Sequence, residues 1–149
     1  MAEVHPDIST SLKEELKEAL LDCEYIAKRR VLKVIIEKEA LLRTIGLISK
    51  ISNGEYHLTT ITGADLDGDQ VELTYFLWLL PQKLRVLIKT RVPKRELKIR
   101  SLTDFIPAAV LYERETYEML GVVFEGHQKL ERLFLPEDWP EGSYPLRRD

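Results

Sequence analysis

Residues 105–149 read FIPAAVLYERETYEMLGVVFEGHQKLERLFLPEDWPEGSYPLRRD, and this stretch predicts a helix followed by an extended tail. Thr103 is a suitable N-cap for the helix, and Gly121 is a suitable C-terminal stop. At about 100° per residue, one face of the helix carries the residues that we expect to point inward. These are Phe105, Ala108, Ala109, Tyr112, Thr116, Met119 and Leu120.

The charged residues of this helix occupy the remaining positions of the wheel. Glu113 and Glu115 lie on the two flanks of the inward stripe, whereas Arg114 and Glu118 point away from it, four residues apart and free to pair. Apolar residues also lie away from the stripe, namely Ile106, Val110, Leu111 and Tyr117. A helix with apolar surface on several sides is either deeply buried or covered by another molecule.

The tail carries large apolar side chains between prolines. The apolar residues are Leu133, Phe134, Leu135, Trp139, Tyr144 and Leu146, and the prolines are Pro136, Pro140 and Pro145. Proline removes backbone donors and does not fit a continuous helix or a central strand. We therefore expect an extended ribbon that wraps its own domain, lies on another protein, or does both.

Upstream of this stretch the pattern predicts alternating helices and strands. Helices are expected at 9–27 and 38–48, and strands at 31–36, 56–62, 71–80 and 84–92. The last strand alternates between apolar and basic residues, which indicates one covered face and one wet face. The predicted fold is α+β: a mixed, mostly antiparallel four-stranded sheet with helices packed on one side and an extended C-terminal tail. We expect a single domain over residues 1–132 and a Pro-rich, partner-binding tail over residues 133–149.

Composition excludes several classes of protein. The chain of 149 residues is 44% hydrophobic and 32% charged, which is typical of a globular protein and not of a disordered one. A formal net charge of −3 argues against a nucleic-acid binder. The longest apolar run is far shorter than the about 20 residues that span a bilayer, and the first residues show no signal-peptide pattern. We expect a cytoplasmic protein that reaches a membrane only through partners.

Candidate catalytic and metal-binding residues are few. The acidic run 65–69 has the wrong spacing for a calcium loop, so we interpret it as a solvated hairpin turn. Glu113, Glu118 and His127 form a conceivable metal or acid–base site, but the two carboxylates project in different directions from the helix. Glycine-rich phosphate loops are missing from the sequence, and the single Cys23 rules out a cysteine cluster. We therefore expect neither catalytic residues nor a cofactor or metal site in this chain.

The same stretch resembles a known family. The run 113–121, ERETYEMLG, is followed by Phe124, Gly126-His127, Leu130, Arg132, the segment LPEDW at 135–139 and PLRRD at 145–149. This pattern closely resembles the 30 kDa subunit family of respiratory complex I (NADH:quinone oxidoreductase), which includes the homologous subunit of membrane-bound nickel–iron hydrogenases. Glu131 departs from the family, because an arginine is usual at that position. The resemblance covers about the last two-thirds of the chain.

The resemblance implies a non-catalytic, hydrophilic subunit of an ion-translocating electron-transport complex, peripheral on the cytoplasmic side of the membrane. Such a subunit would scaffold a large catalytic subunit, of the 49 kDa or hydrogenase type, and iron–sulfur subunits that carry the clusters. The expected interface residues are Glu113, Arg114, Glu115, Glu118, His127, Arg132, Leu133, Phe134, Leu135, Trp139, Tyr144, Leu146, Arg147 and Arg148. Within this set Glu113, Arg114, Glu115 and Arg132 would fix the helix to the tail or to a neighbour by charge-assisted hydrogen bonds, unless they form only exposed salt bridges of little energy.

Two alternatives remain open from the sequence. The parent complex is either a dehydrogenase of the NADH:quinone type or a hydrogenase or other ferredoxin-linked complex. In a different class, the chain is an independent small metal-dependent enzyme that uses Glu118 and His127.

Overall fold

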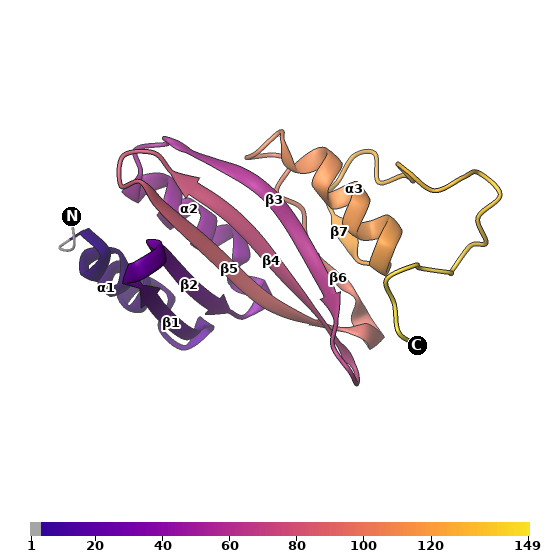
Figure 1. The fold of residues 1–149 in the computed structure, drawn as a ribbon, viewed down its shortest axis with the longest axis horizontal. Helices are drawn as coiled ribbons and strands as arrows, with labels where there is room; N and C mark the ends of the chain where they lie inside the picture. The colour runs from indigo at the N-terminus through magenta and orange to yellow at the C-terminus, as the bar shows by residue number, and fades with distance from the viewer. Residues whose placement is uncertain (1–3) are drawn as a thin grey trace. The chain divides into compact units, whose positions relative to one another are not determined.

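The computed structural model describes residues 4–149, which form two compact units. Unit 1 comprises the residues up to Thr59 together with Thr74–Thr90, and unit 2 comprises Thr60–Leu73 and Arg91–Asp149. Figure 1 shows the elements along the chain. The tail of residues 133–149 belongs to unit 2, and its predicted role in binding a partner stays a prediction.

A five-stranded sheet has the order β1-β2-β5-β4-β3. Its strands are β1 Leu20–Ile26, β2 Val31–Ile36, β3 Tyr56–Asp65, β4 Gln70–Leu79 and β5 Leu84–Pro93. Strand β1 pairs with β2 antiparallel, and β2 pairs with β5 parallel, so the sheet is mixed. The α+β class and the four predicted strands are confirmed, and β1 adds a fifth.

Strand β1 lies where the sequence pattern predicted the second half of a helix over 9–27. Helix α1 (Val4–Leu16) ends earlier, because Lys17 adopts a left-handed φ of 51° and a short 3-10 helix, η1 (Lys17–Ala19), follows. Residues 20–26 instead pair with β2, with Cys23 opposite Val34. The helical prediction for this segment was wrong because pairing with β2, which satisfies the backbone groups, outweighed the local periodicity.

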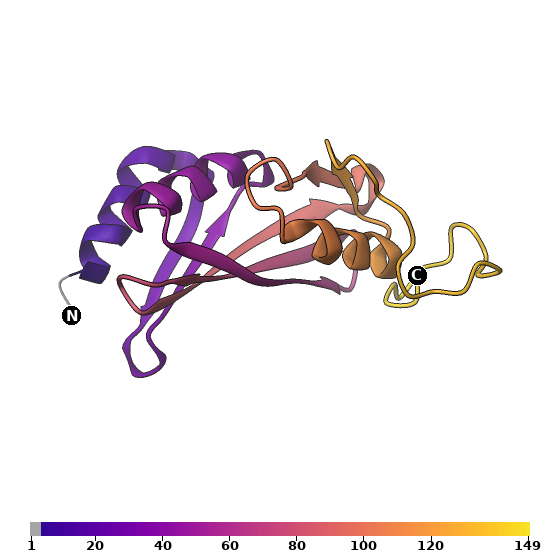
Figure 2. The same ribbon diagram turned by 90° about the horizontal axis from the view of Figure 1, so that it is seen from above.

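Two helices cover one face of the sheet in unit 1. Helix α2 (Leu41–Ile51) follows the 3-10 helix η3 (Lys38–Ala40), and it lies with α1 on the same side of the strands (Figure 2). Buried side chains from both helices meet those of the central strands there. They include Ile8, Leu12 and Leu16 of α1, Ile45 and Ile48 of α2, and Leu32, Val34, Tyr75, Leu77, Val86 and Ile88 of the sheet. A further short 3-10 helix, η2 (Ala27–Arg29), connects β1 and β2.

Unit 2 is built around helix α3 (Ala109–Leu120). A two-stranded parallel ribbon of β6 (Lys98–Arg100) and β7 (Val123–Glu125) flanks it, and the 3-10 helix η4 (Lys94–Glu96) precedes β6. The close approach of α3 to β3 requires Gly63, because a Cβ there would overlap with the Leu120 side chain. Residues 126–149 contain neither helix nor strand.

The start of α3 differs from the prediction. The chain makes turns from Leu102 to Ala108, and the helix begins six residues later than the N-cap proposed at Thr103. Pro107 in this segment has no N–H to donate, so a helix could not continue through it unbroken. Phe105, expected on the inward stripe, is therefore 62% exposed. Among residues 4–149, none of the helices is both long and apolar enough to cross a membrane.

Candidate functional site

Glu118 of α3 holds the beginning of the tail in place. Its carboxylate accepts backbone N–H bonds from Leu133 at 2.9 Å and Leu135 at 2.7 Å on Oε1. The N–H of Phe134 reaches both oxygens, at 3.1 Å and 2.9 Å. Three consecutive amides therefore converge on one side chain that is only 2% exposed. This arrangement replaces the regular backbone pairing that residues 133–135 lack.

The same contacts set the ionisation of Glu118. Burial acts to raise its pKa, but the N–H groups of Leu135, Phe134 and Leu133 together outweigh this effect, and the pKa lies below its usual value. The carboxylate is therefore ionised at neutral pH and accepts charge-assisted bonds, which are stronger than neutral ones. The prediction that Glu118 points outward, free to pair with Arg114, was wrong, because Glu118 is buried against the tail.

Arg114 binds the chain just before that point. Its Nε donates to the carbonyl oxygen of Glu131 at 3.1 Å and its Nη2 to that of Arg132 at 2.7 Å. Arg132 in turn donates to the carbonyl oxygen of Pro136 at 3.3 Å. Arg114 and Glu118, one turn apart on α3, thus bind the carbonyls and the amides of one short segment, which confirms that this helix is fixed to the tail. Glu115 is exposed on the same helix.

Glu113 is fully buried and faces a different segment from Glu118. Its Oε1 accepts the Ser101 hydroxyl at 2.6 Å, and its Oε2 accepts the Leu102 N–H at 2.8 Å. Burial raises the pKa of Glu113, and these two bonds offset the effect only in part. Glu113 therefore ties α3 to the turn that leads into it, and not to the tail.

His127 bridges the other end of the helix to the loop after β7. The Lys129 N–H donates to Nδ1 at 3.0 Å, so Nδ1 carries no proton and the proton is on Nε2. Nε2 lies 3.1 Å from the Val110 carbonyl oxygen in the first turn of α3, to which it therefore donates. Both ring nitrogens of His127 are thus engaged with the backbone.

The last residues of the tail converge on Asp65, which the sequence analysis placed in a solvated turn. Asp65 is instead buried at the end of β3. Its carboxylate pairs with Lys94 at 2.7 Å and accepts the Arg148 N–H at 2.5 Å. The Arg148 bond, followed by the Lys94 bond, holds the pKa of Asp65 below its usual value. For Asp65 that interpretation was wrong because the partners lie far along the chain, 83 residues away for Arg148, where no local pattern signals them. Residues 67–69 are exposed between β3 and β4, as a solvated hairpin turn requires.

Further contacts complete this C-terminal anchor. Arg147 donates through Nη1 to the carbonyl oxygen of Leu120 at 3.1 Å, and it pairs with Asp149 at 2.8 Å. The Leu146 N–H donates to the Met119 carbonyl oxygen at 2.9 Å. The tail is therefore bound to α3 at both of its ends.

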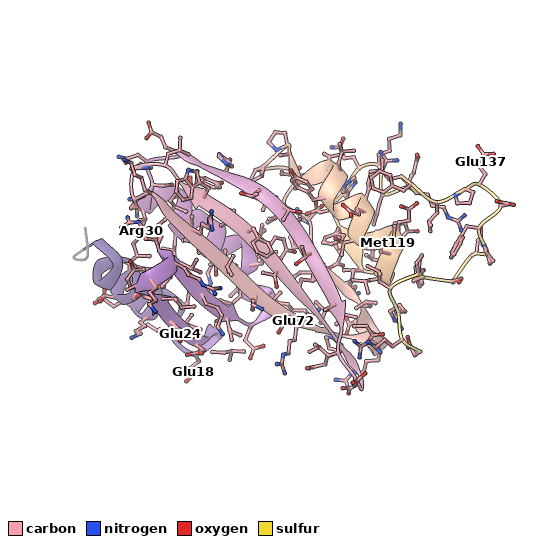
Figure 3. The ribbon with its side chains drawn as sticks, in the orientation of Figure 1. Glu18, Glu24, Arg30, Glu72, Met119 and Glu137 are labelled. Atoms are coloured by element: carbon pink, nitrogen blue, oxygen red, sulfur yellow. The ribbon has the colours of Figure 1, made fainter. Side chains whose placement is uncertain are left out.

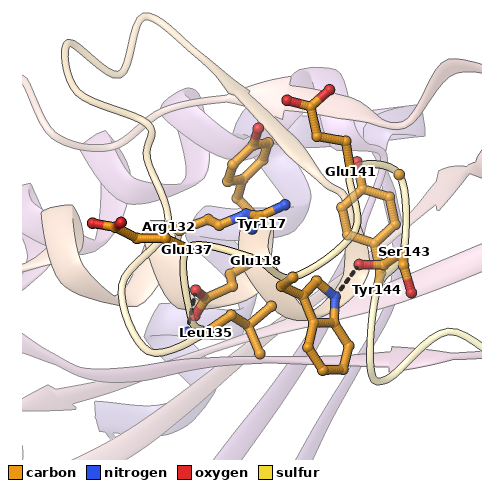
Figure 4. Close-up of a pocket in the computed structure, with 10 residues that line it drawn as sticks. Tyr117, Glu118, Arg132, Leu135, Glu137, Glu141, Ser143 and Tyr144 are labelled. Carbon is orange, nitrogen blue, oxygen red and sulfur yellow. Dashed lines mark hydrogen bonds between the residues drawn. The ribbon is translucent and has the colours of Figure 1, made fainter.

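Between these two anchors the tail borders an open cavity of about 700 Å³ beside α3 (Figure 4). Aromatic side chains of Tyr117, Trp139 and Tyr144 line it together with Glu118 and Arg132. The loop is closed by a bond from the Trp139 indole N–H to the Ser143 carbonyl oxygen at 2.8 Å. Glu137, which also lines the cavity, lies on the outer part of the loop (Figure 3).

The tail is held in place while part of its apolar surface stays uncovered. Phe134 is 66% exposed and Leu146 is 54% exposed, although the backbone of each is hydrogen-bonded to α3. Within the part of the chain that the structure describes, no three His, Cys, Asp or Glu side chains lie close enough together to hold a metal ion. The arrangement is suited to presenting a rigid surface to another molecule.

Known proteins share both the sequence pattern and the fold. A family described as the 30 kDa subunit of the respiratory-chain NADH dehydrogenase matches residues 34–149, more than half of the chain. A subunit of the NADH-quinone oxidoreductase of Roseiflexus castenholzii is 34% identical over 152 aligned residues, which cover all of this chain and 85% of the relative. The chain therefore belongs to the 30 kDa subunit family of complex I, a family of subunits of oxidoreductase complexes, as the sequence pattern predicted.

Two solved structures share the fold. A chain from the archaeal membrane-bound sulfane sulfur reductase superposes with a TM-score of 0.80 at 23% identity, covering 95% of this chain and 82% of that one. A trypsin-resistant fragment of Nqo5, residues 1–134, superposes with a TM-score of 0.68 at 24% identity, covering 83% of this chain and 98% of the fragment. At these identities the likeness establishes the fold alone.

Proposed function

We propose that this chain is a non-catalytic scaffold subunit of a membrane-associated oxidoreductase of the NADH:quinone type. It docks beside the large catalytic subunit and the iron–sulfur subunits, and it holds no cofactor of its own. The name of the Roseiflexus relative supports the quinone-linked type over a hydrogenase. Membrane contact passes through the partner subunits, on the cytoplasmic side.

One observation carries this proposal. The chain uses the charged Glu118 to fix three consecutive amides of a segment without regular structure, and the Phe134 side chain of that segment remains largely exposed. A buried carboxylate stabilises such a segment only at the cost of its own desolvation. A fixed segment with an exposed aromatic residue is what a docking surface needs, because little conformational entropy is then lost on binding.

The contacts of the other predicted interface residues support a division of roles. Arg114, Glu118 and Arg147 fix the conformation of the tail through bonds to backbone groups or to Asp149. Phe134 and Leu146 then provide the apolar contact with the large subunit. Rigid apolar anchors of this kind supply most of the affinity in protein interfaces.

The test compares variants of the tagged chain purified gently from native membranes. Phe134→Asp with Leu146→Asp should lower the recovery of the large catalytic subunit and the iron–sulfur subunits about tenfold or more, as expected for loss of an interface anchor. The matched control is Leu21→Asp, because Leu21 is also exposed, at 56%, but lies in β1 of unit 1. Full recovery with the tail variant would contradict docking through the tail. Purification of the unmodified chain without redox subunits would contradict the scaffold function itself.

A further inference from the structure

The uncovered face of the sheet in unit 1 is not the polar surface that the alternation of β5 predicted. Helices α1 and α2 lie together on one face (Figure 2), where Tyr75, Leu77 and Leu79 of β4 are buried. The alternate residues of that strand, Phe76 and Trp78, point to the opposite face and stay partly exposed. In the described part of unit 1, both α-helices lie on the other side (Figure 2).

A hollow of about 620 Å³ lies on this open face. Phe76, Trp78 and Leu87 line it with apolar surface, and basic side chains of Arg29 and Arg85 stand around them together with His57. The lining contains no aspartate or glutamate. This composition contrasts with the chain as a whole, whose formal net charge is −3.

The position of Arg29 is set by contacts of its neighbour. Arg30, labelled in Figure 3, adopts a left-handed φ of 52° that ends the turn between β1 and β2. Its guanidinium donates to the carbonyl oxygens of Gln82 at 2.7 Å and Lys83 at 3.0 Å. These bonds tie the turn that carries Arg29 to the turn between β4 and β5, next to the start of β5 where Arg85 lies.

The two rim arginines are available to a ligand. Both are exposed, and within residues 4–149 neither guanidinium has an ion-pair partner. A guanidinium presents a planar fork of donors that matches a carboxylate, so unpaired arginines beside an apolar floor favour a ligand that is apolar and acidic at once. Trp and Arg are also the residues that most often dominate protein interfaces.

We propose that this face binds a short segment of a partner protein in which large apolar side chains alternate with carboxylates. The apolar side chains fill the hollow over Phe76 and Trp78, and the carboxylates pair with Arg29 and Arg85. None of the residues that line the hollow belongs to the tail, and the proposal does not depend on the function proposed above. A nucleic acid is the poorer ligand, because two arginines on an acidic chain neutralise few phosphates.

The test uses the full chain and short synthetic peptides as probes. An acetylated Glu-Phe-Leu-Glu-Leu-Glu amide should shift the NMR signal of the Trp78 indole N–H in a saturable way and leave that of Trp139 unchanged. The protein has only these two tryptophans, so a Trp78→Phe variant assigns both signals. A peptide with lysine in place of each glutamate lacks the carboxylates that would form two exposed ion pairs, and it should bind at least about fivefold more weakly. A single-stranded uridine hexamer lacks the large apolar side chains that fill the hollow, and it should be weaker by at least the same factor.

Two variants separate charge recognition from nonspecific binding. Arg29→Gln with Arg85→Gln should weaken the acidic peptide about fivefold, as expected for loss of two exposed ion pairs. Arg95→Gln is the control, because Arg95 is an exposed arginine of unit 2 that does not line the hollow. The proposal is overturned if the acidic peptide leaves the Trp78 signal unchanged, if the basic peptide or the RNA binds as tightly, or if the double variant binds like the unmodified chain.

Discussion

Glu118→Gln should release the first part of the tail without unfolding the rest of the protein. The substitution keeps the size of the side chain and removes its charge. The amide oxygen can take the place of Oε1 and still accept the bonds of Leu133 and Leu135. The amide nitrogen then takes the place of Oε2 and opposes the N–H of Phe134, which keeps only its longer bond, of 3.1 Å, to the oxygen.

The expected magnitude follows from these contacts. Bonds to a charged acceptor contribute about 1.5–3 kcal/mol and neutral ones about 1 kcal/mol. With the bonds of Leu133 and Leu135 weakened and the shorter Phe134 bond replaced by a contact between two donors, the segment should lose about 2–3 kcal/mol of local stability. Its amides should then exchange with solvent about 30- to 150-fold faster, because 1.4 kcal/mol corresponds to a factor of ten.

Hydrogen exchange followed by mass spectrometry or NMR measures this effect at Leu133, Phe134 and Leu135. Glu115→Gln is the matched control, since it removes the same charge from an exposed position of the same helix. Unchanged exchange at the three amides would refute the argument. So would an equal acceleration in the control, or one spread evenly over the strands of unit 1.

Two further predictions concern other contacts of the tail. Gly121→Ala should lower the free energy of unfolding in urea by about 1–2 kcal/mol, because Gly121 has a left-handed φ of 83° and a Cβ there would come within 2.8 Å of the Tyr144 ring. The control is Gly46→Ala, which should be neutral or stabilising, because Gly46 lies in a helix and nothing is within 4 Å of the added Cβ. Equal effects of the two substitutions would contradict the argument. On acidification the Arg148 amide should leave Asp65: a carboxyl whose folded pKa is lowered stabilises the fold above its unfolded value of 3.8 and loses that contribution as the pH falls through the folded pKa. The NMR shift of this amide should therefore titrate with a midpoint below 3.8, and a midpoint at or above that value would exclude the contact.

Strands and helices with a strong local pattern could be predicted from the sequence. The strand over Val31–Ile36 was predicted with its bounds, because branched residues fit a half-buried pleated surface whatever lies beside it. The second half of the predicted helix over 9–27 was wrong, because Leu20–Ile26 forms a strand that pairs with β2. Local periodicity carries no information about such pairing.

The sequence identified important residues of the candidate site, but it did not predict the contacts that they make. Glu118, Arg114 and Arg147 were all singled out from the sequence. The helical wheel nevertheless placed Glu118 outward, because its angle lies away from the stripe expected to face the core, and we expected a charged side chain there to face solvent. The partners here are backbone amides of residues 133–135, which no side-chain pattern reveals.

By itself, the sequence determined the family, the α+β class and the position of the strong strands. Those properties follow from local preferences and from a long motif whose spacing is read directly along the chain. Only the tertiary structure decided that Asp65 meets Arg148, that Glu118 holds the tail, and that Phe76 and Trp78 share an open sheet face with Arg29 and Arg85. Each of these depends on residues brought together by strand order and chain reversal, and the free energy of such contacts comes from burial and hydrogen bonding between distant segments.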